Sequence, residues 1–104
     1  MPPVATPLDP SELAREVERL RLRDGPLASQ AGLEVFLGTA EQLPQVLLEI
    51  GRLRELSFRA VGEGSGRERD LDRFDHDYLH LFLWDPAARA VGGEPAVPAL
   101  DRFR

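Results

Sequence analysis

The chain of 104 residues contains no cysteine and no lysine. Without cysteine it has no disulfide, no thiolate metal site and no cysteine nucleophile, which is compatible with a reducing cytoplasm. Because the 13 basic residues are all arginine, a lysine Schiff base and a lysine general base are excluded as well. Arginine without lysine is typical of a GC-rich genome, and selection for the bidentate guanidinium is the alternative explanation.

Long apolar runs are also missing, since no run approaches the roughly 18 residues that a membrane-spanning helix needs. The first residues lack the basic and apolar regions of a secretory signal. The net charge of −5 gives no electrostatic footprint for nucleic acid. We therefore expect a cytoplasmic protein that binds no nucleic acid and associates with membranes at most peripherally.

Length and periodicity predict one small domain of the α+β class. Residues 1–8 are rich in proline and are expected to form a disordered leader. Asp9 and Pro10 suit the cap and the first position of a helix. The apolar stripe of this helix is narrow, so we expect it to pack loosely or to cover a partner. A second helix is predicted at 42–60, where Gly51 marks a kink or close packing against the sheet.

Two apolar strands are predicted at 33–37 and 78–84. The second has apolar residues on both faces, as a central strand would, and a turn and a possible third strand follow it. The glycine-rich composition of residues 62–69 predicts a flexible loop. Residues 92–104 show no clear period and are expected to form an irregular tail, so the predicted domain covers 9–91.

Arginines gather toward the end of the second predicted helix. Arg54 and Phe58 share a helix face, on which a guanidinium can bind a carboxylate or a phosphate at the edge of a pocket. The alternative is a solvated helix face, in which Glu55 and Arg59 form a favourable i,i+4 pair. Spacing alone favours the solvated face.

Four aspartates follow the loop, at Asp70, Asp72, Asp75 and Asp77. Carboxylates at this spacing can bind an amine, act as a general base or hold a divalent cation. The glycine and the terminal acid that a calcium loop requires are missing. Three interleaved arginines favour mutual neutralisation, and an amine-facing role is the main alternative.

The two histidines carry no specific metal signature. His80 lies in the second strand on the same face as Trp84, where a core histidine is the ordinary case. His76 and His80 have neighbouring aspartates, but their spacing is not that of a zinc site, and no metal site is predicted. Gly62, Gly64 and Gly66 follow a helix rather than a strand, so they indicate a hinge or lid rather than a phosphate cradle.

Several short motifs resemble one family when they are read in order. They are Leu53-Arg54-x-x-x-Phe58-Arg59, Gly62-Glu63-Gly64, Asp70-x-Asp72-x-Phe74-Asp75, Tyr78-x-His80-Leu81 and Leu83-Trp84-Asp85. Their order and spacing resemble the GNAT-related N-acyltransferases, in the branch that includes ornithine-lipid N-acyltransferases and hemolysin-like proteins. The autoinducer (acyl-homoserine lactone) synthases are more distant relatives. The resemblance covers about residues 35–91, over half of the chain.

The resemblance implies the N-terminal portion of a GNAT-like fold. It also implies transfer of an acyl group from acyl-ACP (an acyl carrier protein) or acyl-CoA to an amine acceptor, with a role in lipid synthesis and no tightly bound cofactor. Asp72 and Asp75 would be catalytic, one of them holding the amine or taking its proton. The substrate-binding residues that the resemblance implies are Arg54, Phe58, Arg59, Glu63, Phe74, His80 and Trp84.

The chain departs from the family pattern after Val91 and Gly92. Relatives continue with a Val-Gly-x-Tyr-Arg-Leu-like strand, whereas Pro95 and Pro98 here remove ladder donors. The later strand and helix that hold the thioester cofactor and supply oxyanion donors are absent from the sequence. We therefore expect a truncated, frame-altered or split enzyme that needs a C-terminal half or a second copy. The alternative is a non-catalytic interaction module that pairs through an open sheet edge at Val91.

Overall fold

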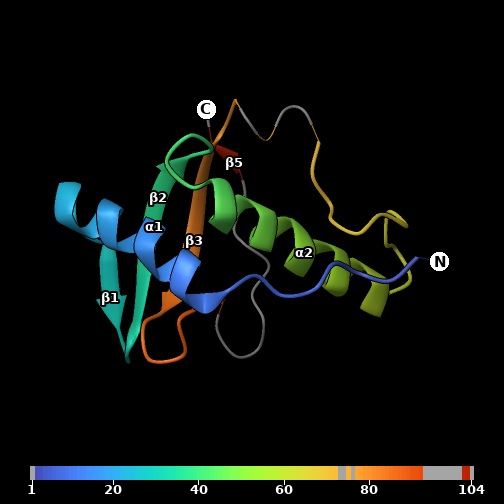
Figure 1. Ribbon diagram of the computed structural model, residues 1–104, viewed down its shortest axis with the longest axis horizontal. Helices are drawn as coiled ribbons and strands as arrows, with labels where there is room; N and C mark the ends of the chain where they lie inside the picture. Colours follow the sequence, from blue (N-terminus) through green and yellow to red (C-terminus); the bar gives the residue numbers. More distant parts are fainter. Residues whose placement is uncertain (1, 73–74, 76, 93–101, 104) are drawn as a thin grey trace.

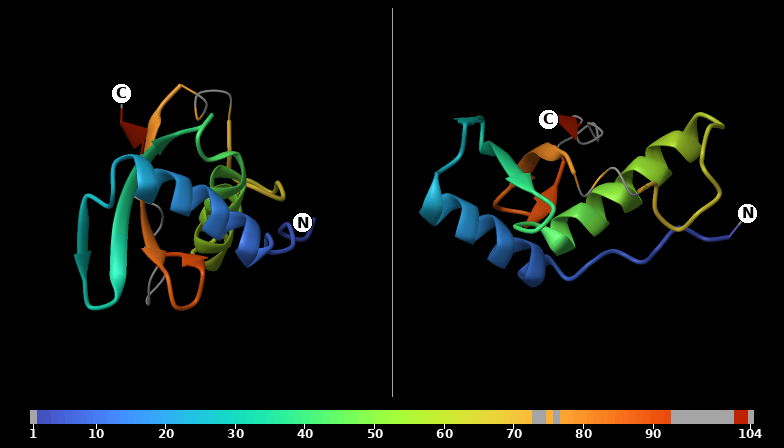
Figure 2. Two further views of the ribbon diagram at one scale, coloured as in Figure 1. Left: turned by 60° about the vertical axis from the view of Figure 1, so that its left-hand side comes forward. Right: turned by 90° about the horizontal axis from the view of Figure 1, so that it is seen from above.

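The computed structural model describes residues 2–72, 75 and 77–92, together with the backbone of 102–103. Within these residues, two helices cover one face of an antiparallel sheet (Figures 1 and 2). The elements are α1 (Pro10–Arg23), β1 (Ala28–Gln30), β2 (Leu33–Thr39), α2 (Pro44–Ala60), β3 (Leu79–Asp85), β4 (Ala90–Val91) and β5 (Arg102–Phe103). The predicted α+β class is confirmed, as are both helices and both main strands.

The strand β3 lies at the centre of the sheet, as its apolar sequence predicted. β2 pairs with it antiparallel from Leu79 to Trp84. On the opposite edge, β4 pairs with one end of β3 and β5 with the other. The side of β3 where an open edge was expected at Val91 is therefore paired with two short strands, β4 and β5. β5 falls within the tail that was expected to be irregular, and the predictions for residues 93–101 and 104 lie outside the described residues.

The strand β1 was not predicted. It is short, its three residues are exposed, and its sequence Ala-Ser-Gln has no apolar period. Its position comes from backbone pairing with β2 across a two-residue turn. Both turn residues have positive φ, 55° at Ala31 and 81° at Gly32, as the favoured hairpin turns require. Because the first of these positions is an alanine, the sequence gave no indication of a hairpin turn there.

The core lies between the two helices and the sheet. Leu13, Val17 and Leu20 of α1 are fully buried, so the expectation that this helix packs loosely is wrong. They pack against the sheet face that carries Phe36 and Phe82, whose rings stack with centroids 6.0 Å apart. Three apolar residues on one narrow stripe are enough to pack α1 closely, because all three point directly into the core.

The start of α2 is held by a carboxylate from α1. Leu43 at the N-cap makes no side-chain capping bond. Instead, the buried Glu16 accepts hydrogen bonds from the backbone N–H groups of Gln45 and Val46, each at 2.8 Å. A carboxylate at this end satisfies donors that the helix leaves unpaired and complements the helix dipole. This contact fixes α1 and α2 relative to each other.

The N-terminal segment 2–8 runs alongside α2, where the sequence predicted a disordered leader (Figures 1 and 2). The backbone N–H of Ala5 donates to the carbonyl of Glu68 at 3.1 Å. Leu8 packs against the core, and its N–H donates to the Glu49 carboxylate at 3.4 Å. Among the described helices, neither is both long and apolar enough to cross a membrane.

Candidate functional site

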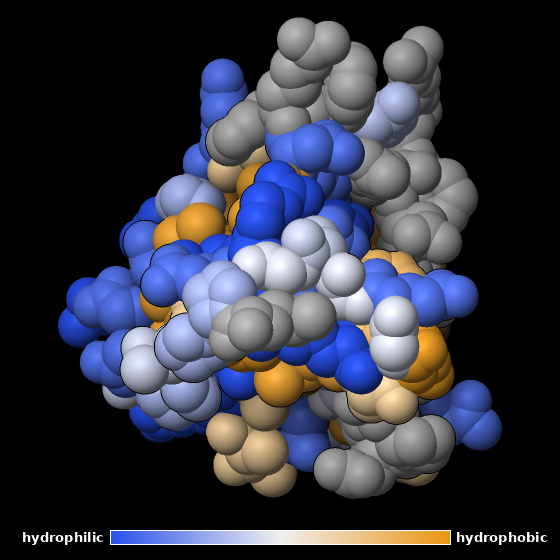
Figure 3. All heavy atoms as spheres, turned by 90° about the vertical axis from the view of Figure 1, so that its right-hand side faces the viewer, coloured by the Kyte–Doolittle hydropathy of each residue, from blue (hydrophilic) through white to orange (hydrophobic). Residues whose placement is uncertain are grey.

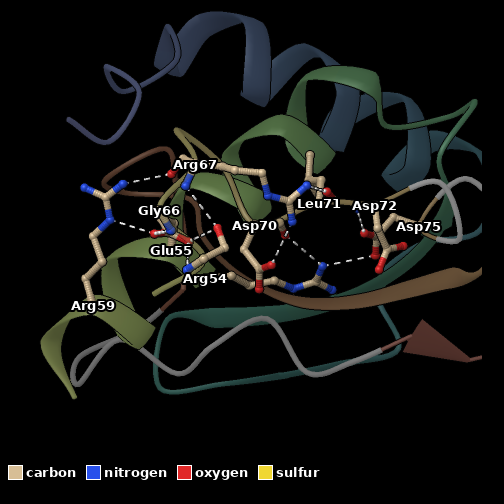
Figure 4. Close-up of polar contacts among 10 residues, drawn as sticks. Arg54, Glu55, Arg59, Gly66, Arg67, Asp70, Leu71, Asp72 and Asp75 are labelled. Atoms are coloured by element: carbon tan, nitrogen blue, oxygen red, sulfur yellow. Dashed lines mark hydrogen bonds and ion pairs between the residues drawn. The ribbon is translucent and has the colours of Figure 1, made fainter. Parts of the chain in front are cut away.

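Two neighbouring residues of α2, Arg54 and Glu55, anchor the loop that connects α2 to β3 (Figure 4). Successive positions of a helix point about 100° apart, because a turn takes 3.6 residues. Glu55 therefore reaches the glycine-rich part of the loop, and Arg54 reaches the aspartates that follow it. The two anchors fix opposite ends of one loop on one rigid helix.

Glu55 is fully buried and accepts hydrogen bonds from three residues. Ser65 donates through its hydroxyl at 2.6 Å and its backbone N–H at 3.0 Å, and the N–H of Gly66 donates at 3.1 Å. Arg59 donates from Nε at 2.6 Å. The Ser65 hydroxyl and then Arg59 lower the pKa of Glu55 to about 2, although burial acts in the opposite direction. The carboxylate is therefore ionised at neutral pH and holds the glycine-rich loop.

Arg59 links three segments of the chain. Besides Glu55, its guanidinium donates to the carbonyls of Arg67 at 3.0 Å and Pro2 at 2.6 Å. The i,i+4 pair predicted from the sequence is thus confirmed. The solvated helix face in which it was expected is wrong, because Arg54 and Glu55 are buried under the loop. All of the described contacts of Arg59 hold the loop and the N-terminal segment in place.

Arg54 forms a buried ion pair with Asp75. Nη1 of Arg54 lies 3.0 Å from Oδ1 of Asp75, and both side chains are almost completely shielded from solvent. The other carboxylate oxygen of Asp75 accepts the backbone N–H of Asp72 at 2.8 Å, and the N–H of Asp75 donates to the carbonyl of Asp72 at 3.1 Å. Arg54 thus holds Asp75, and Asp75 holds the backbone of Asp72.

The two aspartates lie at one side of a cavity of about 260 Å³. Its other described walls are aliphatic and come from the start of α2, the turn before it and the loop. They are Ala40, Pro44, Leu47, Leu48 and Leu71. Asp72 is exposed and Asp75 is buried. The site therefore places the exposed Asp72 beside an apolar cavity, and Arg54 pairs with the buried Asp75 next to it.

The structure places the remaining predicted site residues in different surroundings. His80 is buried, and its Nε2 lies 2.6 Å from the backbone carbonyl of Asp75. Trp84 is buried in the core beneath α1. Phe58 is partly exposed, and Glu63 is an exposed loop residue. Phe74, like His76, lies outside the described residues.

The surface around the end of α2 is mostly hydrophilic, with hydrophobic areas interspersed (Figure 3). Phe58 is 39% exposed at this end of the helix.

A second, larger cleft of about 440 Å³ lies between α1 and the turn after β3, lined by Arg15, Arg21 and Arg89 among others. Within the described part of the chain, no group of three histidines or acidic residues could hold a metal ion.

Residues 53–94 match the family model described as the acetyltransferase (GNAT) domain. The chain contains part of a GNAT acetyltransferase domain. The matched GNAT segment begins one residue before Arg54. It includes the loop anchored by Glu55, both aspartates, and the strands β3 and β4.

Two curated relatives are similar to nearly the whole chain. One is a glycine N(alpha)-acyltransferase of Bacteroides thetaiotaomicron, 36% identical over 94 residues, which are 88% of this chain and 26% of the relative. The other is a glycine N(alpha)-acyltransferase of Phocaeicola vulgatus, 35% identical over 94 residues, which are 88% of this chain and 27% of the relative. The chain thus spans about a quarter of the length of these relatives. No solved structure shows a significant match.

Sequence reasoning missed the apolar half of the candidate site. Leu47, Leu48 and Leu71 looked like ordinary core or loop residues, because apolar spacing does not distinguish a packed wall from a cavity wall. One signal was present in Gly51, which was noted as a possible close contact. A Cβ at Gly51 would lie 2.4 Å from Cγ of Leu71, so the close neighbour is the loop rather than the sheet.

Proposed function

We propose that this chain forms the acceptor-binding part of an enzyme that transfers an acyl group from a thioester to the amino group of glycine or another small amino acid. The observation that carries the proposal is the accessible carboxylate of Asp72 at the side of an apolar cavity, held in place through Asp75 and Arg54. The likeness to two glycine N-acyltransferases gives the reaction class. The acyl donor is acyl-ACP or acyl-CoA, both of which are thioesters.

In this proposal Asp72 acts on the acceptor amine. An amino group is protonated near neutral pH, so a carboxylate first attracts the ammonium ion and then acts as the base that takes its proton. Asp72 accepts this first proton and releases it to solvent. The free amine attacks the thioester carbonyl, a C–N bond forms, and the C–S bond breaks. The nitrogen loses its second proton in this step, and the leaving thiolate takes up a proton to become the thiol, so one proton is released overall.

Asp75 and Arg54 have positioning roles in this proposal. Both carboxylate oxygens of Asp75 are already hydrogen bonded, one to Arg54 and one to the N–H of Asp72. His80 supports the same segment through the carbonyl of Asp75. Phe58 and Glu63 are accessible for substrate contact, whereas Trp84 and Arg59 act through the core and the loop.

The test is formation of N-octanoylglycine from glycine and octanoyl-CoA, followed by mass spectrometry. Positioned general bases contribute about 10²–10⁴ in rate, so Asp72→Asn should reduce product formation by at least about a hundredfold. Asp75→Asn should also reduce it, because the backbone of Asp72 loses its support. The matched control is Asp77→Asn, an exposed aspartate of the same stretch, which should retain activity. Equal turnover by the Asp72 and Asp77 variants would remove Asp72 from the reaction.

A further inference from the structure

The geometry points to the cavity beside Asp72 as the binding site for the apolar chain of the acyl donor, an inference that rests on the proposed N-acyl transfer. The described walls away from the two aspartates carry only aliphatic side chains. Ala40 and Leu47 are both buried, at 7% and 4% exposure. An aliphatic ligand would replace water against these walls, and removing apolar surface from water is favourable.

The size of the cavity limits the chain that it can hold. At roughly 30 Å³ for each water-sized group, about 260 Å³ accommodates about eight or nine heavy atoms. A medium-length acyl chain of around eight carbons fits this volume. Longer chains would have to leave the cavity and return to solvent.

The charge of the site selects an acyl chain over other apolar ligands. A fatty-acid anion would bring its carboxylate next to Asp72 and Asp75, which is unfavourable because like charges repel. A thioester is neutral and has no such cost. Glycine, the acceptor in the names of the two relatives, has no side chain to fill a cavity. With the chain in the cavity, the thioester carbonyl would lie near Asp72, where the amine is expected, as a reactive arrangement requires.

Gly51 and Leu71 set the length limit. Leu71 lines the cavity and packs onto α2 at the point where Gly51 has no side chain. An added Cβ would approach three carbons of Leu71 at 2.4, 2.8 and 3.0 Å. The glycine therefore lets Leu71 lie close to the helix. Leu71 and Leu48 both line the cavity, and the size of these side chains should determine which acyl chains bind.

The experiment measures binding of acetyl-, butyryl-, hexanoyl-, octanoyl- and decanoyl-pantetheine to the 104-residue chain by calorimetry. Each methylene that enters the cavity should tighten binding by up to about fourfold, and the gain should stop near octanoyl. Leu48→Trp should weaken octanoyl-pantetheine binding by about tenfold or more, since the indole fills space that several methylenes would occupy. It should weaken acetyl-pantetheine binding much less, because an acetyl group brings no further methylenes into the cavity. The control Leu22→Trp changes a residue of α1 that is 80% exposed and should have no effect.

A second variant protects the test against loss of folding. Leu71→Ala enlarges the cavity, so the gain in affinity should extend to decanoyl-pantetheine, which an unfolded chain could not show. Affinity that is independent of chain length, or absent for every probe, would overturn the inference. Equal weakening of acetyl and octanoyl binding by Leu48→Trp would also overturn it. Chain-length-dependent binding without any acylation of glycine would instead contradict the proposed function and leave the chain-binding cavity in place.

Discussion

At the scale of single residues, the charged side chains of the site are held by many contacts. Buried charges are tolerated only when they are paired and hydrogen bonded. Glu55 meets this condition with donors from Ser65, Gly66 and Arg59, and Asp75 meets it with Arg54 and the N–H of Asp72. The carboxylate proposed to meet substrate, Asp72, is by contrast exposed. Buried charges thus hold the loop, and the exposed Asp72 is the carboxylate that the proposed reaction uses.

The sequence could predict the Glu55–Arg59 pair, because both residues lie four apart on one helix and their distance follows from helix geometry. It could not predict the Arg54–Asp75 pair. These residues lie 21 positions apart, and the loop between them has no period from which its path could be predicted. For the same reason, spacing alone did not distinguish the four aspartates. The family resemblance pointed to Asp72 and Asp75, and both line the cavity in the described structure.

The low pKa of Glu55 predicts how the loop responds to acid. A carboxylate whose pKa is lowered in the folded state stabilises that state above its unfolded pKa, and this contribution is lost as the pH falls through the folded value. The window here runs from the ordinary value of 4.5 down to about 2. Glu55→Gln should therefore be less stable than the wild type at neutral pH, and the difference should shrink between these values.

Urea denaturation of both proteins at neutral pH and at several acidic pH values measures this difference. Glu18→Gln is the control, because Glu18 lies on the exposed side of α1 with a side chain that is 54% exposed. The Glu18→Gln variant should have the same stability as the wild type at every pH. A Glu55→Gln deficit that stayed constant down to the lowest pH would contradict the assignment of this carboxylate as the group that holds the loop.

At the scale of secondary-structure elements, sequence periodicity was sufficient for α1, α2, β2 and β3. Each helix has an apolar stripe that matches its buried side, and each strand is a short apolar run. The start of α1 was also predictable, since Asp9 accepts the N–H of Ser11 at 2.9 Å and Pro10 follows. The start of α2 was not, because its cap comes from Glu16 in another helix. The start of a helix such as α2 is decided by contacts between elements rather than by the helix propensities of its own residues.

The contact between α2 and the loop predicts an unusual response to a helix-favouring substitution. In an exposed helix, Gly→Ala stabilises by up to about 1 kcal/mol. At Gly51 the new methyl would overlap Leu71, so Gly51→Ala should instead destabilise the fold by about 1–3 kcal/mol, as overpacking does. Chemical denaturation of Gly51→Ala measures the cost.

The matched control for Gly51→Ala is the double variant Gly51→Ala/Leu71→Ala. With the leucine shortened, the alanine methyl has room, and the double variant should be more stable than Leu71→Ala alone because alanine is the better helix former. Independent, additive effects of the two substitutions would show that residues 51 and 71 do not share the contact.

At the scale of the whole molecule, the site lies between the start of α2, the turn before it and the loop that leads to β3. Glu16 joins the two helices, Arg59 joins α2 to the N-terminal segment, and Arg54 and Glu55 join α2 to the loop. The chain spans about a quarter of the length of the relatives it matches, so both acyl transfer and an acceptor site in this region belong to the proposal. The alternative of a non-catalytic interaction module stays a prediction, and it requires no ligand in the cavity.

The most direct test of the account is a chemical-shift map of the isotope-labelled chain with octanoyl-pantetheine. Binding in the proposed cavity predicts that the largest amide shifts fall at Ala40, Leu47, Leu48 and Leu71. The cleft between α1 and the turn after β3 is larger and is the natural competitor on this molecule. Shifts concentrated there, at Ala14 and Arg89, would contradict the assignment of the cavity beside Asp72 as the substrate site.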